Sequence, residues 1–336
     1  MTRARALGLQ ALPVVAVLVA LYALVLLMKL LGSSVTLSRQ PLVNGLAIGA
    51  VYAALALALT LIYRATDVAN FGQGETATFC SFIAWSFIVP HEAWFGFITN
   101  FYLRFILGFG ATLIVAAILG ALIERLVIRP VETAPLLTIV IVTLGLFEIF
   151  NSASNFIWQS QPKPFPTPFK GAALKLFGTT VGRPQVGLFV VVLLVMGLVA
   201  LLFQKTKLGL ALRATAQNPS AARLMGVPTS TMLMVGWALA TAVGAMAGIL
   251  VANIVTIDPN MMLGPLLFAF AGAVLGGLDN PIGAVIGGLL VGIIQNVIGS
   301  TDVFKEIRDP IAFLIILIAL VIRPSGLLGR AASKKV

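Results

Sequence analysis

Residues 186–203 read VGLFVVVLLVMGLVALLF, an apolar run without a charged side chain. A helix needs about 20 mostly apolar residues to cross the hydrocarbon core of a bilayer, so this run predicts a transmembrane helix. Polar residues begin at Gln204 and Lys205, which places one end of the helix at a membrane surface. The same interpretation applies to the rest of the chain, because similar apolar runs recur along its length.

The composition indicates that lipid surrounds most of the chain. Hydrophobic residues make up 60% of the sequence, charged residues 10%, and the mean hydropathy is +1.06. A soluble domain carries roughly 25% charged residues, so an ordinary wet exterior is excluded. We predict an all-α membrane protein, a polytopic bundle of about ten transmembrane helices in a single domain over 1–336. The other expected spans are 11–31, 42–63, 76–98, 103–123, 136–157, 231–251, 263–278, 281–298 and 310–322.

Two aspects of these spans are less regular. The run at 11–31 is longer than the 7–15 apolar residues of a usual signal peptide, so we expect an uncleaved span. Only Asp279, Asn280 and Pro281 separate the spans at 263–278 and 281–298. Several runs are shorter than 20 residues, which leaves tilt or partial re-entry open.

The Lys and Arg residues predict the orientation. They gather near both chain ends and in the loops that an even number of spans places on one side, which favours cytoplasmic N- and C-termini. The basic segment 323–336 becomes a cytoplasmic tail, and the proline-rich loop 158–185 becomes the largest external feature, either a cap or a docking surface. This topology accounts for the net charge of +11 without a nucleic-acid partner. We expect no metal or cofactor, because His91 has no metal-ligating neighbours, and Cys80 is a single cysteine.

Glycines spaced four residues apart predict close helix packing. Without a hydrophobic force between helices in lipid, small residues let backbones approach and gain dispersion contacts. We also considered a movable hairpin at Gly276–Gly277, where a gate could operate. The pairs are Gly45/Gly49, Gly244/Gly248, Gly272/Gly276, Gly283/Gly287 and Gly288/Gly292.

A polar interruption at 204–230, on the predicted cytoplasmic side, carries the clearest functional signal. Asn218 suits a helix N-cap, Pro219 the first helical position and Gly226 the left-handed position after a helix. The helix between them, Pro219 to Met225, is too short to be stable alone and must rest on another element. Its surface would combine Ala221, Ala222, Leu224 and Met225 with the charges of Arg213 and Arg223.

This loop resembles the branched-chain amino-acid ABC permease family, whose corresponding segment reads roughly GxxxRAxxQxxxAAxxMGI. Ser220 replaces the glutamate of the wider importer signature Glu-Ala-Ala-x-x-x-Gly, which removes one charge contact. Asn44–Ala53, Asn70–Glu75, Arg129-Pro130 and the glycine-rich 272–292 region extend the resemblance over about 41–325, with Gly72 and Gln73 in place of the usual Ala and His. The resemblance favours the H-type over the M-type subunit and implies ATPase contacts at Gly209, Arg213, Gln217, Pro219, Ser220, Ala221, Ala222, Arg223, Met225 and Gly226.

The resemblance also implies the setting. A permease of this kind sits in a bacterial inner membrane, pairs with an M-type permease subunit, receives substrate from an external solute-binding protein, and is driven by two cytoplasmic ABC ATPases. Its substrates would be branched-chain amino acids, or else urea-like amides or small organic acids. The sequence contains no GxxxxGK[ST] motif, so we expect no ATP hydrolysis by the chain itself and no enzymatic activity.

Two other classes of transport protein were weighed. An ion-coupled secondary transporter usually places several ionisable groups near the membrane midplane, whereas we find only Glu148 well inside a span, where pairing with Asn151 is an alternative role. A passive channel would leave the loop at 204–230 unexplained. We place Asn70–Glu75 on the inner side, for packing or gating before substrate contact. Pathway or gate candidates, each equally consistent with a helix–helix hydrogen bond, are Asn44, Asn70, Gln73, Glu75, Thr143, Glu148 and Asn296.

Overall fold

The computed structural model describes residues 39–66, 68–89, 97–176 and 178–300, together with 306, 309–310, 313–314, 317, 321 and 325–329. The expected span at 11–31, His91, most of the expected span at 310–322 and most of the basic tail lie outside the described residues. The regular elements of the described part are helices, apart from one short hairpin. Its helices are α2 (Arg39–Thr66), α3 (Gln73–Ile88), α4 (Phe101–Ile123), α5 (Leu136–Trp158), α6 (Arg183–Lys205), α7 (Lys207–Gln217), α8 (Pro219–Leu224), α9 (Thr229–Ala252), α10 (Leu263–Gly276) and α11 (Pro281–Gly299).

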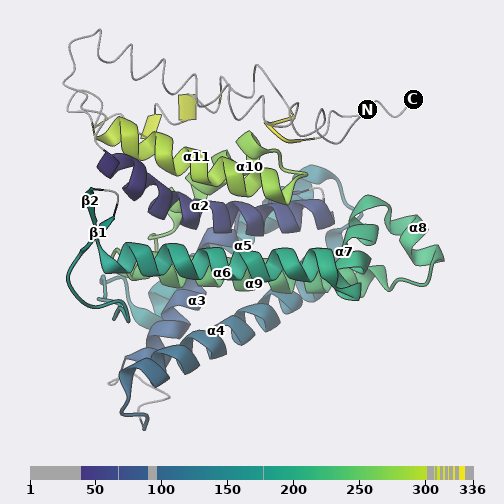
Figure 1. Ribbon diagram of the computed structural model, residues 1–336. Helices are drawn as coiled ribbons and strands as arrows, with labels where there is room; N and C mark the ends of the chain where they lie inside the picture. The colour runs from purple at the N-terminus through teal and green to yellow at the C-terminus, as the bar shows by residue number, and fades with distance from the viewer. Residues whose placement is uncertain are drawn as a thin grey trace.

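The remaining elements are short. A π-helix, η1 (Glu124–Ile128), and a 3₁₀ turn, η2 (Arg129–Val131), continue directly from α4. Strands β1 (Leu174–Leu176) and β2 (Thr179–Val181) pair antiparallel, with Lys175 opposite Thr180. In Figure 1 the hairpin and the α7–α8 pair lie at opposite ends of the long helices. The predicted helical bundle is confirmed, and the hairpin is an addition to it.

Six described helices are long and apolar enough to cross a membrane: α2, α4 with its extension, α5, α6, α9 and α11. Their bounds agree closely with the predicted spans. By contrast, α3 has 16 residues and α10 has 14, or roughly 24 and 21 Å at 1.5 Å per residue, less than the hydrocarbon thickness. The chain is therefore a multi-pass membrane protein, and two of the ten expected crossings are short helices.

The start of α3 lies inside the bundle, whereas the sequence suggested that Asn70–Glu75 is a segment just before a span. The Gln73 amide donates to the carbonyl of Ala240 at 3.0 Å, and Ala240 is midway along α9. Gly74, in the first turn of α3, lies against Leu266 in the first turn of α10. Both short helices therefore begin in the interior, so a polar segment that resembled a surface loop is enclosed by other helices.

Glycine contacts join α2, α10 and α11 into one block, seen together along one side of Figure 1. A methyl group added at Gly292 would overlap the backbone of Gly49, and one added at Gly272 would come within 2.6 Å of the Gly288 backbone. Similar overlaps occur between Gly276 and Gly283. All five predicted glycine pairs lie at such close approaches, with Gly244 and Gly248 against α3. The prediction of close packing is confirmed.

The proposed mobile hairpin at 276–281 is held by another segment. The backbone N–H groups of Leu327 and Leu328 donate to the carbonyls of Leu275 and Gly276, at 2.7 and 3.1 Å. The Asn280 side chain donates to the Leu328 carbonyl at 2.9 Å. These bonds fix the turn between α10 and α11, so motion there requires the 325–329 segment to move as well.

The proline-rich loop covers one end of the bundle. Its described residues between α5 and α6 contain no helix, and Phe165 is buried in the core. Lys163 exchanges backbone hydrogen bonds of 2.9 Å with Ile257 in the loop between α9 and α10, and the Trp85 indole donates to the Pro164 carbonyl. The observed contacts are those of a cap.

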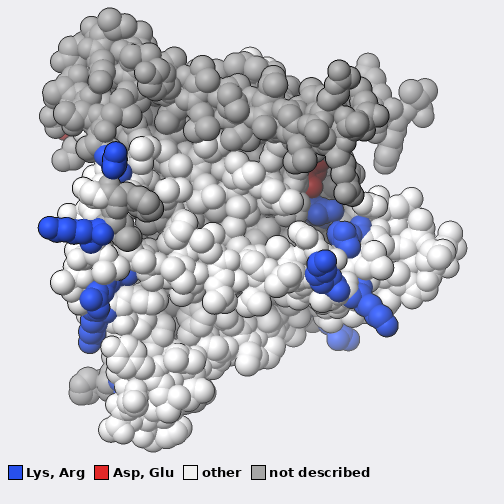
Figure 2. Space-filling model, in the orientation of Figure 1, with Lys and Arg blue, Asp and Glu red and all other residues white. Residues whose placement is uncertain are grey.

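Figure 2 shows how charge is arranged on one face of the molecule. Lys and Arg side chains gather at the two ends of the long helices, and a broad band between them shows none of the four charged residue types. A band of this kind matches the apolar core of a bilayer, with cations at its two surfaces. The surface therefore agrees with the helix assignments.

Candidate functional site

The α7–α8 pair forms a projection at the end of α6 and before α9, and it contains the whole predicted contact set. Asn218 caps α8, accepting from the Ala221 N–H at 3.0 Å. Gly226 follows the helix at φ +82°, the left-handed conformation that favours glycine. The predicted caps are confirmed, and α8 ends at Leu224, one residue before the predicted end.

One face of the projection is packed against the bundle. Gly209 is buried where α7 crosses α6, and a Cβ there would overlap the backbone of Leu202 and Phe203. Ala222 is 5% exposed, and Arg223 donates to the Thr229 hydroxyl at the start of α9. The short helix therefore rests on α9, as its length required.

The opposite face is open. Leu224 and Met225 are 89% and 83% exposed at the tip, outside the long apolar helices. Gln217, Pro219, Ser220, Ala221 and Gly226 are also exposed. Leu224 and Met225 therefore give an ordered projection an exposed apolar tip.

Arg213 points to a different place. Its Nε donates weakly to the Gly209 carbonyl, at 3.4 Å, and its side chain lines a cavity of about 380 Å³ together with Arg64, Phe203 and Asn280. The cavity lies where α2, α6 and α7 meet the start of α11. Arg213 therefore joins the projection to the bundle and is not on the open tip.

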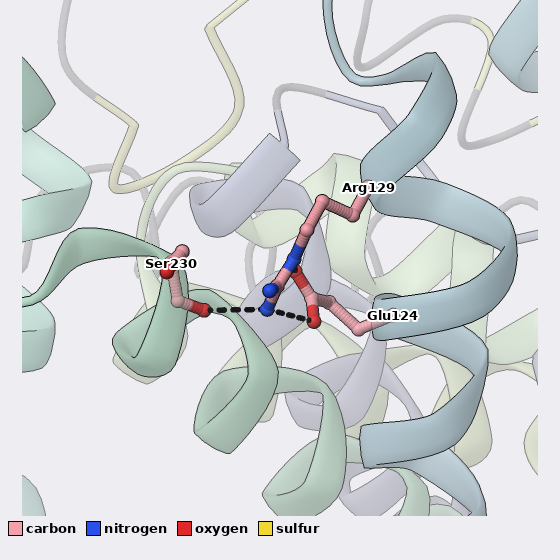
Figure 3. Close-up of polar contacts among 3 residues, drawn as sticks. All are labelled: Glu124, Arg129 and Ser230. Carbon is pink, nitrogen blue, oxygen red and sulfur yellow. Dashed lines mark hydrogen bonds and ion pairs between the residues drawn. The ribbon is translucent and has the colours of Figure 1, made fainter.

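An ion pair that the sequence analysis missed clamps α4 to α9 beside the projection. The Arg129 guanidinium donates to both Glu124 carboxylate oxygens, at 3.1 and 2.8 Å, and to the Ser230 carbonyl at 3.2 Å. Figure 3 shows Arg129 lying between the π-helical turn that carries Glu124 and the first turn of α9. Glu124 is 1% exposed. The clamp therefore ties the element after α8 to the end of α4.

A second polar group lies in the interior, at the start of α3. Glu75 is 1% exposed, and its Oε2 accepts from the Asn151 amide on α5 at 3.3 Å. The same amide donates to Asn260 Oδ1 at 2.9 Å, in the turn before α10. Asn70 and Gln73 bond to each other at 3.2 Å. Three segments that are distant in the sequence thus meet where the two short helices begin, in the interior of the bundle.

This arrangement corrects two expectations. Asn151 bonds to Glu75 and Asn260 and not to Glu148, and Glu75 is a second ionisable group well inside the bundle. Glu148 is exposed on the outer face of α5. The remaining candidates make local bonds: Asn44 accepts from Gln40, Thr143 donates to the Val140 carbonyl and Asn296 donates to the Gly292 carbonyl.

A glycine-packed bundle of apolar helices, with a polar interior site and a clamped projection at one end, defines a membrane permease. The chain belongs to the family described as branched-chain amino acid transport system / permease component, which it matches over residues 42–320. It is the permease component of an ABC transport system and is not itself catalytic, and this membership implies ATPase and binding-protein partners. The predicted family and H-type resemblance are confirmed.

Individual relatives agree with this assignment. The chain is 31% identical to the high-affinity branched-chain amino acid transport system permease protein BraD of Pseudomonas aeruginosa, over 88% of this chain and 97% of the relative. It is 32% identical to the probable branched-chain amino acid transport permease protein LivH of Methanocaldococcus jannaschii, over 90% and 95%. A more distant relative, 24% identical over 66% of this chain and 62% of the relative, is the fructose import permease protein FruF of Bifidobacterium longum. No solved structure matches the chain significantly.

Proposed function

We propose that the chain is one of two different translocation subunits of an ATP-driven importer for branched-chain amino acids in a bacterial inner membrane. The observation that carries the energy-coupling part is the projection itself. Its tip exposes Leu224 and Met225, its base is buried through Gly209 and Ala222, and its last residues lead into the clamped start of α9. A partner bound at the tip would therefore move α9 and α4 together.

The occupant of this surface is a cytoplasmic ABC ATPase, with one ATPase serving each translocation subunit. The exposed face is small and apolar at its tip, and Ser220 leaves it without an acidic side chain. The surface therefore suits a shallow apolar pocket on the ATPase more than a basic one. In this arrangement the projection and both chain termini face the cytoplasm, and the proline-rich cap faces the solute-binding protein outside.

The outer face of α5 is the surface that the second permease subunit, of the M type, covers. Glu148 is exposed there among Ile141, Leu144 and Ile149, each at least 48% exposed. A carboxylate facing lipid at membrane depth is costly, so this face is better placed against protein or a polar path. A pathway between the two subunits would run along α5, past Glu148 and Asn151.

Branched-chain amino acids are the proposed substrates because two relatives near 30% identity, which match most of this chain, are described as branched-chain amino acid transport permeases. The fructose permease shows that relatives include sugar carriers, so uptake of amides, organic acids or sugars is the outcome to test against. An ion-coupled transporter is the other alternative. It predicts uptake that follows an ion gradient and needs no ATPase.

The test is reconstitution of the chain with its partner permease, ATPases and binding protein in liposomes. We expect leucine uptake only when ATP is present on the ATPase side, and no ATP hydrolysis by the chain alone. Leu224→Ser with Met225→Ser should abolish co-purification of the ATPases. The matched control, Leu174→Ser in the hairpin at the other end, should retain it. Uptake without ATPases, or ATPase binding by the tip variant, would overturn the proposal.

A further inference from the structure

The strongest unexplained feature of the structure is a carboxylate oxygen with no partner. Glu75 is 1% exposed, yet its Oε1 has no hydrogen bond among the described residues, and no ion pair to Glu75 occurs there. Its other oxygen has one long bond, 3.3 Å, from Asn151. Burying a carboxylate without partners is unfavourable, so an orphaned oxygen of this kind indicates a missing donor.

The one amide that bonds to Glu75 is shared with other acceptors. The Asn151 amide carries two hydrogens and faces three acceptors, namely Glu75 Oε2 at 3.3 Å, the Pro259 carbonyl at 3.4 Å and Asn260 Oδ1 at 2.9 Å. Its own Oδ1 accepts from Asn155 at 3.0 Å. The unused capacity of this site is for accepting hydrogen bonds, so its ligand must donate several of them.

The electrostatics favour a cation. Asp258 adds a second carboxylate to the site, in the turn whose Asn260 shares the Asn151 amide with Glu75. Asp258 Oδ1 accepts from the Asn260 backbone N–H at 2.9 Å, which fixes the turn before α10. A ligand with a positive charge would offset the negative charge of these carboxylates and fill the orphaned oxygen at once.

The site can be reached. Asn260 and Glu148 are exposed, and Asn151, which bonds to both Asn260 and Glu75, is half-buried. The proline-rich cap joins the same turn from outside through the Lys163–Ile257 bridge, one residue before Asp258. The polar route therefore runs from the capped end of the bundle to the inner start of α3.

We propose that Glu75, Asn151 and the Asp258–Asn260 turn bind the primary ammonium group of the transported amino acid as it passes through the bundle. An ammonium group offers three donors and one positive charge, which matches an orphaned carboxylate oxygen and a surplus of acceptors. The inference rests on the proposed function. The new element is that the permease itself recognises the charged amine, in addition to any selection by the binding protein.

The test uses the complete reconstituted transporter with saturating leucine-loaded binding protein. Glu75→Gln keeps the size of the side chain and removes its charge, so leucine uptake per assembled complex should fall about tenfold or more. The matched control is Thr78→Val, which alters a buried side chain of α3 whose hydroxyl has no partner among the described residues.

Glu75→Asp separates charge from packing. If Glu75 binds an ammonium group, the smaller but charged Asp variant should transport faster than the Gln variant. If Glu75 only fills space, Gln should transport as well as the wild type and better than Asp, which would overturn the inference. Equal losses for Glu75→Gln and Thr78→Val would overturn it as well.

The same vesicles separate a failure of the ammonium site from a failure of the proposed function. Failure of the wild-type complex to take up leucine would contradict the proposed function. Normal wild-type uptake with an unaffected Glu75→Gln variant would contradict the ammonium site alone. A requirement for a sodium or proton gradient at constant ATP would assign Glu75 to an inorganic cation instead and would also overturn the site.

Discussion

Replacing Arg129 should destabilise the protein more than replacing Glu124, the other member of the clamp. Glu124 is fully enclosed, whereas the Arg129 side chain is 32% exposed. Replacing Arg129 by Met leaves a buried carboxylate without its two charge-assisted hydrogen bonds. Replacing Glu124 by Met leaves a guanidinium that water can still reach, and that keeps its bond to the Ser230 carbonyl.

The expected magnitudes follow from this difference in exposure. Removing one partner of a fully buried ion pair costs about 3–5 kcal/mol, and partial exposure of Arg129 reduces this to about 2–3 kcal/mol for Arg129→Met. Glu124→Met should cost about 1 kcal/mol, close to a single hydrogen bond. The double variant leaves no buried charge and should cost about 1 kcal/mol, which is less than Arg129→Met alone.

The assay is equilibrium unfolding of the purified chain in mixed detergent micelles, with the wild type and the three variants compared under identical conditions. A functional readout accompanies it, because a loosened clamp should lower leucine uptake per ATP hydrolysed in the reconstituted transporter. Equal costs for the two single variants, or a double variant at least as unstable as the sum of both, would refute the reasoning.

Three further predictions concern the projection. Gly209→Ala should reduce ATP-driven uptake strongly, because its methyl group would overlap the α6 backbone near Leu202, and transport assays on vesicles check this. Gly226→Ala should cost about 1 kcal/mol at its left-handed φ while Gly226→Asn costs less, as measured by unfolding in micelles. A cysteine at Ser220 should react with an impermeant maleimide only from the cytoplasmic side; Cys80 is buried and gives no background, and labelling from outside would contradict the topology.

Features set by neighbouring residues were the ones that the sequence predicted well. Apolar runs determined the long helices, since crossing a bilayer demands a minimum apolar length. Asn218, Pro219 and Gly226 predicted α8 because capping is a local effect that involves only a few adjacent residues. These predictions needed no knowledge of which helices are neighbours.

The interior site could not be predicted in this way. Glu75 meets Asn151 and Asn151 meets Asn260, pairs that lie 76 and 109 positions apart in the chain. The start of α3 also resembled a surface loop, because Asn70–Glu75 is polar and rich in glycine in either setting. Only its enclosure by α9, α5 and the turn before α10 makes it interior. The Glu124–Arg129 pair was missed because a π-helical turn brings its members together.

The glycine contacts among α2, α10 and α11 have a mechanical consequence. Where backbones touch directly, few side chains remain that could change rotamer and settle into a second arrangement, so the three helices should travel as one stiff body. Displacement that begins at α8 must then be absorbed at the borders of this body, along α6 and α9, where side chains form the contacts. The cavity beside Arg213 lies on one of these borders, and its empty volume leaves space for the adjoining helices to move.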